Sequence, residues 1–518
     1  MNEHDRDIRD ITLPALVGAM IDPAMSLIDS AYAGRLGATS LAALGPCTSI
    51  FHFSFNTFRA LTFTTTALVA KYVAMNRKEQ AGQVGKQSLA LALTLGLLTA
   101  GALAALATPF LRLMGVGARS PLLPHALPYL KVRALVAPVV LCMMAMEGIF
   151  RGHGDTLTPL VAGAAAAAVN FSLDPILMFR LGMGVSGAAA ATCIAEVVAA
   201  GIYGFLLLRR REQFGFAPPQ PGPDAPAPVL GAKKPLPNLS RRRARRPLRA
   251  VVGGLVQGEL ALLRTLLVAN GAMFARSLSL MATWACATAT ATRLGTAHVA
   301  AHQVVLSLWL FLALVVEAPG VAAQILAGRY HSVGKTKQLQ SLLRRLIIVV
   351  FTSGCTMGAL LWVGRGALPR LFATDPEVLS HCRRLLDILV LQQPVVGLTL
   401  VLESFLVGCG QFAYLARATV ASAAATAGLI QLVGRGVLPG ALARLLPGGG
   451  LPAAAAAPEV VHVWHCLTGF FFLRLVAVAL RLADPVRGPL KPLVIAEEEE
   501  GNSSDAGSTH MPSGTGNL

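Results

Sequence analysis

The chain has 518 residues, of which 54% are hydrophobic and 14% are charged, and its mean hydropathy is +0.61. Soluble domains carry about 25% charged residues, so this composition excludes an ordinary soluble enzyme or binding domain. The net charge of +18 is of the sign that attracts nucleic acid or a membrane surface. Because the chain is so apolar, we interpret the positive charge as contacting a membrane surface, and we expect no nucleic-acid partner.

The apolar residues come in segments close to the ~20 residues that a helix needs to cross a bilayer. Short alternating strands, the pattern of a transmembrane barrel, are not visible. The first segment, which holds two aspartates, and the eleventh are the least apolar. The runs and their breaks predict twelve membrane helices, at residues 11–33, 46–70, 86–111, 126–150, 157–180, 185–208, 260–291, 296–326, 341–364, 378–408, 411–437 and 460–482.

An internal repeat supports this count. Positions in the first six spans match positions in the last six at an offset of 258, which slips to 256 after the third span. The matched pairs are Arg35 and Arg293, Gly37 and Gly295, Tyr72 and Tyr330, Arg112 and Arg370, Pro138 and Pro394, and Glu147 and Glu403. Because a six-helix unit ends on the side where it began, both halves share one orientation and are related by an axis along the membrane normal. The sequence therefore predicts an all-α polytopic membrane protein, with twelve transmembrane helices in two six-helix lobes related by pseudo-two-fold symmetry.

The charge distribution predicts the domain organisation. The basic, Pro-rich stretch 209–255 is interpreted as a cytoplasmic linker between an N-lobe at 11–208 and a C-lobe at 256–485. Residues 1–10 form a cytoplasmic N-terminus, and the polar tail 486–518 is expected to be disordered. With the N-terminus inside, the cytoplasmic segments hold roughly twice as many Lys and Arg residues as the outer ones.

Ionisable groups inside membrane helices mark candidate functional sites because they are costly to bury. The first span carries Asp22 and Asp29, which share a face because seven residues are close to two helical turns. In the fifth span Asn170 and Asp174 share a face at i and i+4, and Thr192 lies among alanines in the sixth. These oxygen donors suit a monovalent cation or a shared proton. Asp22 precedes a proline and is interpreted as a helix-end group in water instead.

The second half carries Arg276, Glu317 and Glu403 in its seventh, eighth and tenth spans. They are candidates for substrate contacts in a cavity, together with Gln303, although mutual pairing as a structural charge cluster fits the sequence equally well. Arg276 would attract an organic anion, and the carboxylates would hold a cation.

The polar stretch "EGIFRGHGDTLTPL" at 147–160 lies between two apolar runs. Two glycines in it, Gly152 and Gly154, predict a tight cytoplasmic turn, and Arg151 and Asp155 are placed to cap or clamp the helix ends. A catalytic site would need a nucleophile and a base, and none is supplied. We expect no enzymatic activity.

His298 and His302 are spaced i and i+4, a spacing that can bind a metal. The glutamate of an HExxH motif is absent between them. We expect neither a metal site nor a cofactor other than H⁺ or Na⁺ as a coupling ion.

Four stretches resemble the multidrug and toxic compound extrusion (MATE) family, in its DinF-like branch and closest to plant-type members. They are "PAMSLIDSAYAGRLGATSLAALG", "GIFRGHGDTLTPL" with "NFSLDPILMFRLGMGVSGAAAAT", "AAHQVVLSLWLFLAL", and "LFATDPEVL" followed by "QQP". The resemblance implies a twelve-helix, two-lobed, cation-coupled antiporter. It further implies an N-lobe coupling site of Asp29, Asn170, Asp174 and Thr192, and a first helix that bends at Pro14.

On this resemblance we expect a secondary active efflux transporter, coupled to H⁺ rather than Na⁺, that exports drugs, other xenobiotics or organic acids by alternating access. The expected partners are a small-molecule substrate and membrane lipids, and the expected state is a monomer. A lipid or oligosaccharide flippase of the same superfamily and a non-transporting membrane scaffold are the alternatives. No signal or transit peptide pattern is visible, so the sequence leaves open the plasma membrane and an internal membrane of the plastid or vacuole.

Overall fold

The computed structural model describes residues 3–36, 38–114, 116–117, 119–216, 248–371, 375–437 and 459–490. This part of the chain is almost entirely helical. The first half contains α1 (Glu3–Leu36), α2 (Ala38–Phe58), α3 (Ala60–Ala74), α4 (Lys78–Ala105), α5 (Ala107–Leu113), α6 (Leu123–Leu135), α7 (Ala137–Gly152), α8 (Leu157–Pro175), the π-helical turn η1 (Ile176–Arg180) and α9 (Val185–Arg209). The second half contains α10 (Leu248–Leu294), α11 (Thr296–Ser332), α12 (Thr336–Gly364), the 3-10 turn η2 (Leu368–Leu371), α13 (Pro376–Gly408), α14 (Phe412–Gly434) and α16 (Val460–Ala483).

The helices account for all twelve predicted spans. Within the described residues, nine helices are long and apolar enough to cross a membrane, and α6 with α7 forms a tenth span bent by 49°. The helix α1 and the pair α2–α3 lie at the two remaining predicted spans, 11–33 and 46–70. Large apolar side chains cover the outer faces of the helices, with Leu98 69% and Leu391 79% exposed, as lipid contact requires. The predicted fold class is confirmed.

Several helices extend beyond the predicted spans. The helix α1 begins at Glu3, within the predicted N-terminal tail, and α10 begins at Leu248, within the predicted linker. Hydropathy detects only the apolar part of a helix, so its polar ends in water are missed. The α1 helix is also continuous through Pro14 and Pro23. The central part of the linker, at 217–247, and the tail from 491 onwards lie outside the described residues.

The internal repeat reappears in the packing of the two halves. In the first half, α4 approaches α7 so closely that a Cβ on Gly96 would overlap the Cα of Pro138. In the second half a Cβ on Gly354 would stand 2.7 Å from the Cα of Pro394. Since 354 is 258 beyond 96 and 394 is 256 beyond 138, both contacts follow the offsets of the repeat. Each lobe therefore uses the same glycine-against-proline contact to pack its third span on its fourth.

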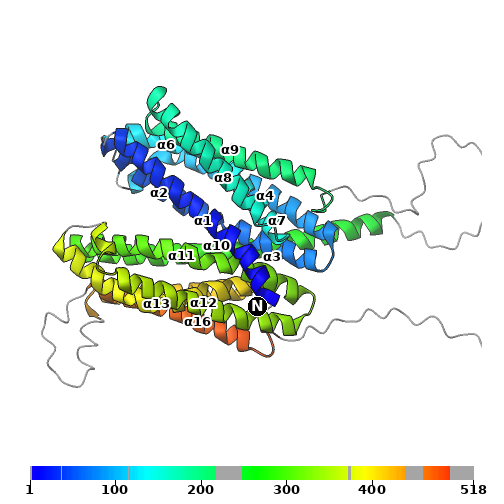
Figure 1. The fold of residues 1–518 in the computed structure, drawn as a ribbon. Coiled ribbons are helices and arrows are strands. Elements are labelled where there is room, and N and C mark those ends of the chain that lie inside the picture. Colours follow the sequence, from blue (N-terminus) through cyan, green and yellow to red (C-terminus); the bar gives the residue numbers. More distant parts are fainter. Residues whose placement is uncertain are drawn as a thin grey trace, which may run out of the picture.

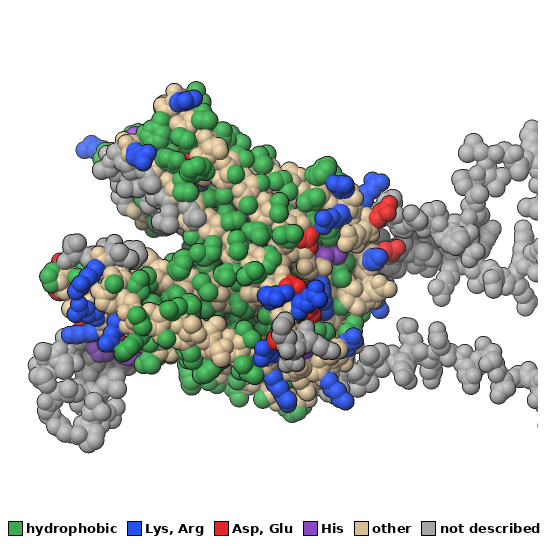
Figure 2. All heavy atoms as spheres, in the orientation of Figure 1, with side chains coloured by type: hydrophobic (Ala, Val, Ile, Leu, Met, Phe, Trp, Pro, Cys, Tyr) green, Lys and Arg blue, Asp and Glu red, His purple; other side chains and the backbone are tan. Residues whose placement is uncertain are grey.

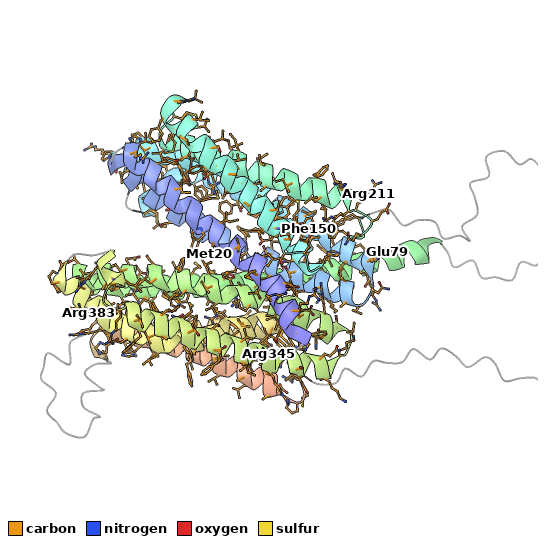
Figure 3. All side chains as sticks on the ribbon, in the orientation of Figure 1. Met20, Glu79, Phe150, Arg211, Arg345 and Arg383 are labelled. Atoms are coloured by element: carbon orange, nitrogen blue, oxygen red, sulfur yellow. The ribbon has the colours of Figure 1, made fainter. Side chains whose placement is uncertain are left out.

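The two lobes meet at one end and diverge at the other. Helices α1–α9 form the N-lobe and α10–α16 the C-lobe (Figure 1). We call the end where α1 begins and α9 and α16 finish the closed end, and the opposite end the open end. The space-filling view shows a wedge-shaped cleft between the lobes at the open end (Figure 2). The α1 helix starts against the C-lobe at the closed end and runs along the N-lobe to the open end, with Met20 midway (Figure 3).

Candidate ion-coupling site and lobe junction

Three of the four predicted coupling residues are linked by hydrogen bonds in the N-lobe. The side-chain amide of Asn170 donates to Asp174 Oδ1 at 3.4 Å and to Thr192 Oγ1 at 3.3 Å. The Thr192 hydroxyl in turn donates to the carbonyl of Ala188 at 2.9 Å. Asn170 and Asp174 are buried, at 1% and 0% exposure. The structure thus brings residues from α8 and α9 into one enclosed polar cluster.

Asp29 joins this cluster from α1. Its carboxyl group lies within side-chain hydrogen-bonding reach of the Asp174 carboxyl. One oxygen on each residue, Asp29 Oδ1 and Asp174 Oδ2, is buried without a hydrogen-bond partner among the described residues. Two carboxyl groups in contact can form a hydrogen bond only if one of them carries a proton. The chemistry of this cluster, two neighbouring carboxyl groups with unpartnered buried oxygens, suits a shared proton or a bound cation.

Local backbone structure shapes this cluster. The α-helix α8 ends directly after Asp174, and the chain continues as the π-helical turn η1. Such π-turns occur frequently at functional sites. The following helix packs closely on this turn, because a Cβ on Gly187 would stand 2.7 Å from the carbonyl carbon of Leu177. A larger residue there would push α9, and with it Thr192, away from Asn170.

An ion pair beside the cluster was not predicted. Arg133 in α6 and Glu196 in α9 form a salt bridge of 2.6 Å, with side chains 13% and 17% exposed. The guanidinium also lies 5.1 Å from the ring centroid of Phe51 and interacts electrostatically with Asp29. Both charges stand in predicted spans, so the rule that intramembrane charges mark candidate sites was sufficient to find them.

Two of the C-lobe candidates, Arg276 and Glu403, lie together in one buried cluster. Glu403 accepts hydrogen bonds from Arg276 at 2.5 Å and from Arg474 at 2.6 and 2.8 Å, and is 1% exposed. Arg474, which was not among the predicted site residues, is 2% exposed and lies over the rings of Phe470 and Phe471. Glu403 is thus the centre of a buried three-residue ion cluster. Its pairing with Arg276 is the arrangement that the sequence offered as the alternative to a substrate contact.

Glu317 is not part of that cluster. It pairs with Arg59 of the N-lobe at 3.4 Å, and the two side chains are 34% and 43% exposed. Gln303 is exposed on α11, and among the described residues no hydrogen bond joins its side chain to the other candidates. The four C-half candidates therefore occupy three different places.

Further contacts between the lobes cluster toward the closed end. Gln324 Nε2 donates to the carbonyl of Phe63 at 2.7 Å, and Thr64 Oγ1 bonds Asn270 Oδ1 at 2.8 Å. Nearer the end, the ring of Tyr330 packs edge-on against His4 in α1, with centroids 5.6 Å apart. These polar contacts close the cleft at its narrow end.

The stretch 147–160 belongs to the same junction. Gly154 has φ +88°, and Arg329 of the C-lobe packs so closely over it that a Cβ would overlap its guanidinium. The same guanidinium donates to the carbonyl of His153 at 3.1 Å. Asp155 accepts from Thr158 N at 2.8 Å, at the start of α8. The predicted turn is therefore also an interlobe contact.

His302 is held by the C-lobe core. Its Nε2 lies 3.0 Å from Thr288 Oγ1, and its Nδ1 accepts from Trp464 Nε1 at 3.1 Å. His298 instead packs against His381, with the two rings tilted by 50° and their centroids 4.2 Å apart. The two histidines therefore have different partners, and the described chain contains no group of three side chains placed to hold a metal ion.

Comparisons with known proteins place this architecture in a family. The MatE family model matches residues 14–176 and 273–430, one segment in each lobe. The chain is 31% identical to Protein DETOXIFICATION 44, chloroplastic, of Arabidopsis thaliana over 503 residues, which cover 95% of this chain and 85% of the relative. It is 30% identical to DNA damage-inducible protein F of Escherichia coli over 215 residues, covering 40% of this chain and 45% of that protein.

Solved structures agree on the fold. An outward-facing multidrug resistance MATE family transporter superimposes with a TM-score of 0.73 at 18% identity, over 92% of this chain and 94% of that one. A variant of the Vibrio cholerae MATE transporter VcmN gives 0.72 at 20% identity, over 92% and 97%. The DinF-like resemblance is confirmed, and the chain belongs to the MatE family as a multi-pass membrane transporter for the efflux of multidrug and toxic compounds, not an enzyme.

Proposed function

We propose that this protein is a cation-coupled antiporter that uses H⁺ in preference to Na⁺, with Asp29, Asn170, Asp174 and Thr192 as its coupling site. The observation that carries the proposal is the contact between the Asp29 and Asp174 carboxyl groups. A proton satisfies this contact, whereas a bare Na⁺ needs several converging oxygens. The Asn170 amide nitrogen faces both Asp174 and Thr192, and a nitrogen donor would oppose a metal cation there.

The two acids lie on different helices, and this links protonation to conformation. Asp29 belongs to α1, whose first turns contact the C-lobe, while Asp174 belongs to α8 of the N-lobe. A proton held between them ties α1 to the N-lobe. Release of the proton leaves two negative charges in contact, which repel and favour a different position of α1. A ligand shifts a conformational equilibrium only through such a difference between states.

The closed end is assigned to the cytoplasm. It carries the charged start of α1, the arginines at 209–211 and the basic first turns of α12, in keeping with the positive-inside rule. The conformation described here is then open to the outside.

We place the protein in a plastid membrane, because two relatives that cover 95% and 79% of the chain are named chloroplastic. We also propose that it acts as a monomer. A fluorescent fusion and the mass of the purified particle test these two points.

Proton uptake into proteoliposomes under an imposed substrate gradient tests the coupling. Wild-type protein should take up protons as substrate leaves, and Asp174→Asn and Asp29→Asn should abolish that flux. Asp387→Asn is the matched control, because Asp387 is 56% exposed and pairs with Arg365 at the open end. Flux that requires Na⁺, or that persists in Asp174→Asn, would refute this assignment.

A further inference from the structure

We propose that the acidic segment 497–500 of this chain binds to the basic face of α12 at the closed end, and that this contact weakens the closed end. The segment lies within "AEEEEGN" in the tail beyond the described residues. The inference goes beyond the proposed transport function, because neither the docking contact nor its test depends on the coupled ion or on the substrate.

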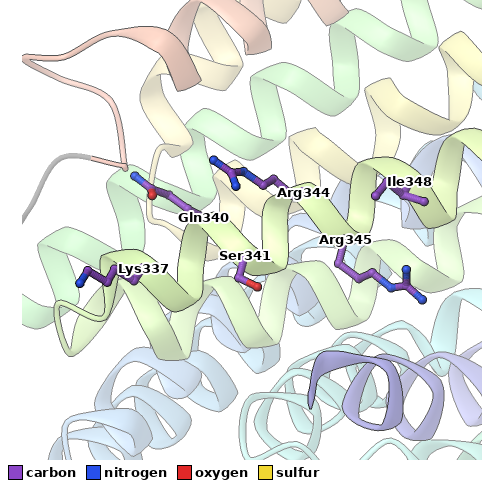
Figure 4. Close-up of a pocket in the computed structure, with 6 residues that line it drawn as sticks. All are labelled: Lys337, Gln340, Ser341, Arg344, Arg345 and Ile348. Carbon is purple, nitrogen blue, oxygen red and sulfur yellow. The ribbon is translucent and has the colours of Figure 1, made fainter. Parts of the chain in front are cut away.

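A pocket of about 250 Å³ lies on the surface of α12 near the start of this helix. Its lining residues come from successive turns of α12 and are Lys337, Gln340, Ser341, Arg344, Arg345 and Ile348 (Figure 4). Three of them are cations, and the sequence has no acidic residue between Glu317 and Asp375. The pocket is therefore a basic site that receives no carboxylate from its own helix.

Two of the three cations have no partner in the described part of the chain. Neither Lys337 nor Arg344 makes a side-chain hydrogen bond or ion pair there, and both residues are exposed. Arg345 is instead held by Asp5 of α1, at 2.6 and 3.0 Å. An anion in this pocket can thus bind Lys337 and Arg344 without breaking an existing contact.

The tail starts beside this pocket. After α16 the chain packs back on the C-lobe, where Gly488 and Pro489 are buried. The side chain of His331 is hydrogen-bonded to the backbone of Pro489, and His331 lies in the last turn of α11, five residues before α12 begins. Figure 4 shows the orange chain that follows α16 on the side of α12 toward which Gln340 and Arg344 point. The tail is therefore tethered close to the basic face.

The acidic segment can reach the pocket from this tether. Glu497 follows Leu490, the last described residue, by seven positions, and seven extended residues span up to about 25 Å. The pocket extends from Lys337 to Ile348, which corresponds to roughly 16 Å of helix. A short tether of this kind gives an effective concentration on the order of millimolar, so even a weak contact is populated.

The charges of the two elements are complementary. The tail supplies four adjacent carboxylates at 497–500, and the pocket supplies three cations within about 12 Å of helix. A single exposed ion pair contributes little to binding, whereas several charges in one network contribute together. A lipid phosphate group would bring one negative charge to this face. The observations therefore favour the tail as the occupant.

Occupation of the pocket acts on the closed end through Arg345. This arginine lines the pocket and also holds Asp5 of α1. Carboxylates in the pocket offer Arg345 a second anion, and they place negative charge beside the net acidic start of α1, "EHDRDIRD". Both effects weaken the contact between α1 and α12. The tail then binds more tightly when the closed end has opened, and its binding shifts the equilibrium toward that state.

The distance between two spin labels on the purified full-length protein tests the docking. One label is placed on α12 at Gln338→Cys, outside the pocket lining, and the other on the tail at Ala496→Cys, with the exposed Cys355 replaced by serine. We expect a narrow population of short distances. It should be lost in the tail variant, in which all four glutamates at 497–500 are changed to glutamine. It should also be lost at about 1 M NaCl, where the Debye length falls to about 3 Å.

Matched charge changes separate docking from a general effect of charge. Lys337→Gln with Arg344→Gln should abolish the short-distance population, whereas Lys78→Gln with Arg211→Gln should preserve it. Lys78 and Arg211 are equally exposed cations at the closed end, but they belong to the N-lobe (Figure 3). Lys337→Glu with Arg344→Glu should also abolish the population, and a change of all four glutamates at 497–500 to lysine should restore it. Such a restoration excludes misfolding as the cause of the loss.

The proposal fails if the wild type shows only long, broad distances, or if the tail variant keeps the short-distance population. It also fails if phosphatidylglycerol, added to nanodiscs of neutral phosphatidylcholine, removes this population, because the pocket then belongs to lipid headgroups.

The effect on the closed end is measured separately, with labels at Arg119→Cys and Arg383→Cys on the two lobes at the open end. Because the tail variant no longer weakens the closed end, it should show fewer short distances between the lobes than the wild type. Unchanged distances would overturn the effect on the closed end and leave the docking contact in place.

Discussion

The carboxylate of Asp5 accepts two hydrogen bonds from the guanidinium of Arg345, at 2.6 and 3.0 Å, and so joins the first turn of α1 to α12 of the other lobe. Figure 4 shows Arg345 directed from α12 toward α1, whereas Gln340 and Arg344 point away on the other side of α12. Asp29 lies 24 residues further along the same helix, roughly 36 Å away at about 1.5 Å per residue. One helix therefore carries both a coupling acid and a contact that holds the closed end.

Asp5→Asn should weaken the closed end and shift the protein toward the state in which the open end narrows. The two-point contact becomes at best a neutral hydrogen bond, which is roughly half as strong as a charge-assisted one. Spin labels at Arg119→Cys and Arg383→Cys, with the exposed Cys355 replaced by serine, would report a larger population of short distances between the lobes. Asp10→Asn is the control, because the ion pairs of Asp10 within the described part of the chain are with Arg6 and Arg9 of α1 itself. An identical distance distribution in Asp5→Asn and Asp10→Asn would count against the role of the Asp5 contact.

Gly96→Ala should destabilise the protein, whereas Gly101→Ala on the same helix should not. A Cβ at position 96 would overlap the Cα of Pro138, which is backbone that cannot give way, while a Cβ at 101 meets no atom within 4 Å. Overpacking of this kind costs about 1–3 kcal/mol, and alanine at the open site gains helix propensity of up to about 1 kcal/mol. Thermal unfolding in detergent compares the two variants. Equal midpoints would mean that α4 shifts without cost.

Thr192→Ala should reduce proton-coupled transport several-fold, while Thr192→Ser should retain most of it. The hydroxyl is one of two acceptors of the Asn170 amide, and a buried amide hydrogen without its acceptor costs about 1–3 kcal/mol. Asn170 would then rotate and no longer hold Asp174. Initial rates of proton uptake and the pH at half-maximal rate separate this effect from simple misfolding, because Thr192→Ser keeps the hydroxyl. A serine variant as impaired as the alanine variant would point to the methyl group rather than to the hydrogen bond.

The amino-acid sequence is sufficient to place Asn170, Asp174 and Thr192 because their relationship is local or follows a family spacing. Helical periodicity determines which residues of one helix share a face, and this alone puts Asn170 beside Asp174. It does not determine which helices face each other. The Arg133–Glu196 pair joins residues 63 positions apart on different spans, and nothing within either helix indicates its partner.

The same limit explains the outcome in the second half. Arg276, Glu317 and Glu403 form one group in the sequence because all three are charges in C-half spans. The structure instead pairs Glu317 with Arg59 of the other lobe. The sequence contains one indication of this pairing, because the two residues are separated by the repeat offset of 258. Arg474 is missed because the segment "FFFLRLV" is so apolar that one arginine hardly lowers its mean hydropathy.

Acidification should weaken the closed end through His153. Burial lowers the pKa of His153 below its ordinary value, and the charge of Arg329 lowers it further, while the Ile149 carbonyl and Asp155 act in the opposite direction. The closed end holds the neutral imidazole, so its stabilisation is complete above about pH 6.5, the unperturbed histidine value. It declines as the pH falls from there toward the lowered pKa. The spin-label pair of the Asp5 experiment, measured from about pH 7.5 to 5, should show a pH response that is smaller in His153→Gln. A response of the same size in His153→Gln would assign the pH dependence to other groups.

Glu403→Gln should destabilise the C-lobe far more than Arg276→Gln. Glu403 is the sole carboxylate among the described residues that is bonded to both Arg276 and Arg474, and its removal leaves two buried guanidinium groups without a counter-charge. Breaking a buried ion pair in this way costs about 3–5 kcal/mol. Arg276→Gln instead leaves the two-point contact of Arg474 with Glu403 in place and removes the surplus positive charge. Chemical unfolding in detergent should therefore separate the two variants by roughly 2 kcal/mol or more. Proton uptake measured on the folded fraction adds a second criterion. If the ion cluster is structural, Glu403→Gln should keep a normal, Asp174-dependent proton flux. Loss of this flux with unchanged stability would instead place ion coupling in the C-lobe.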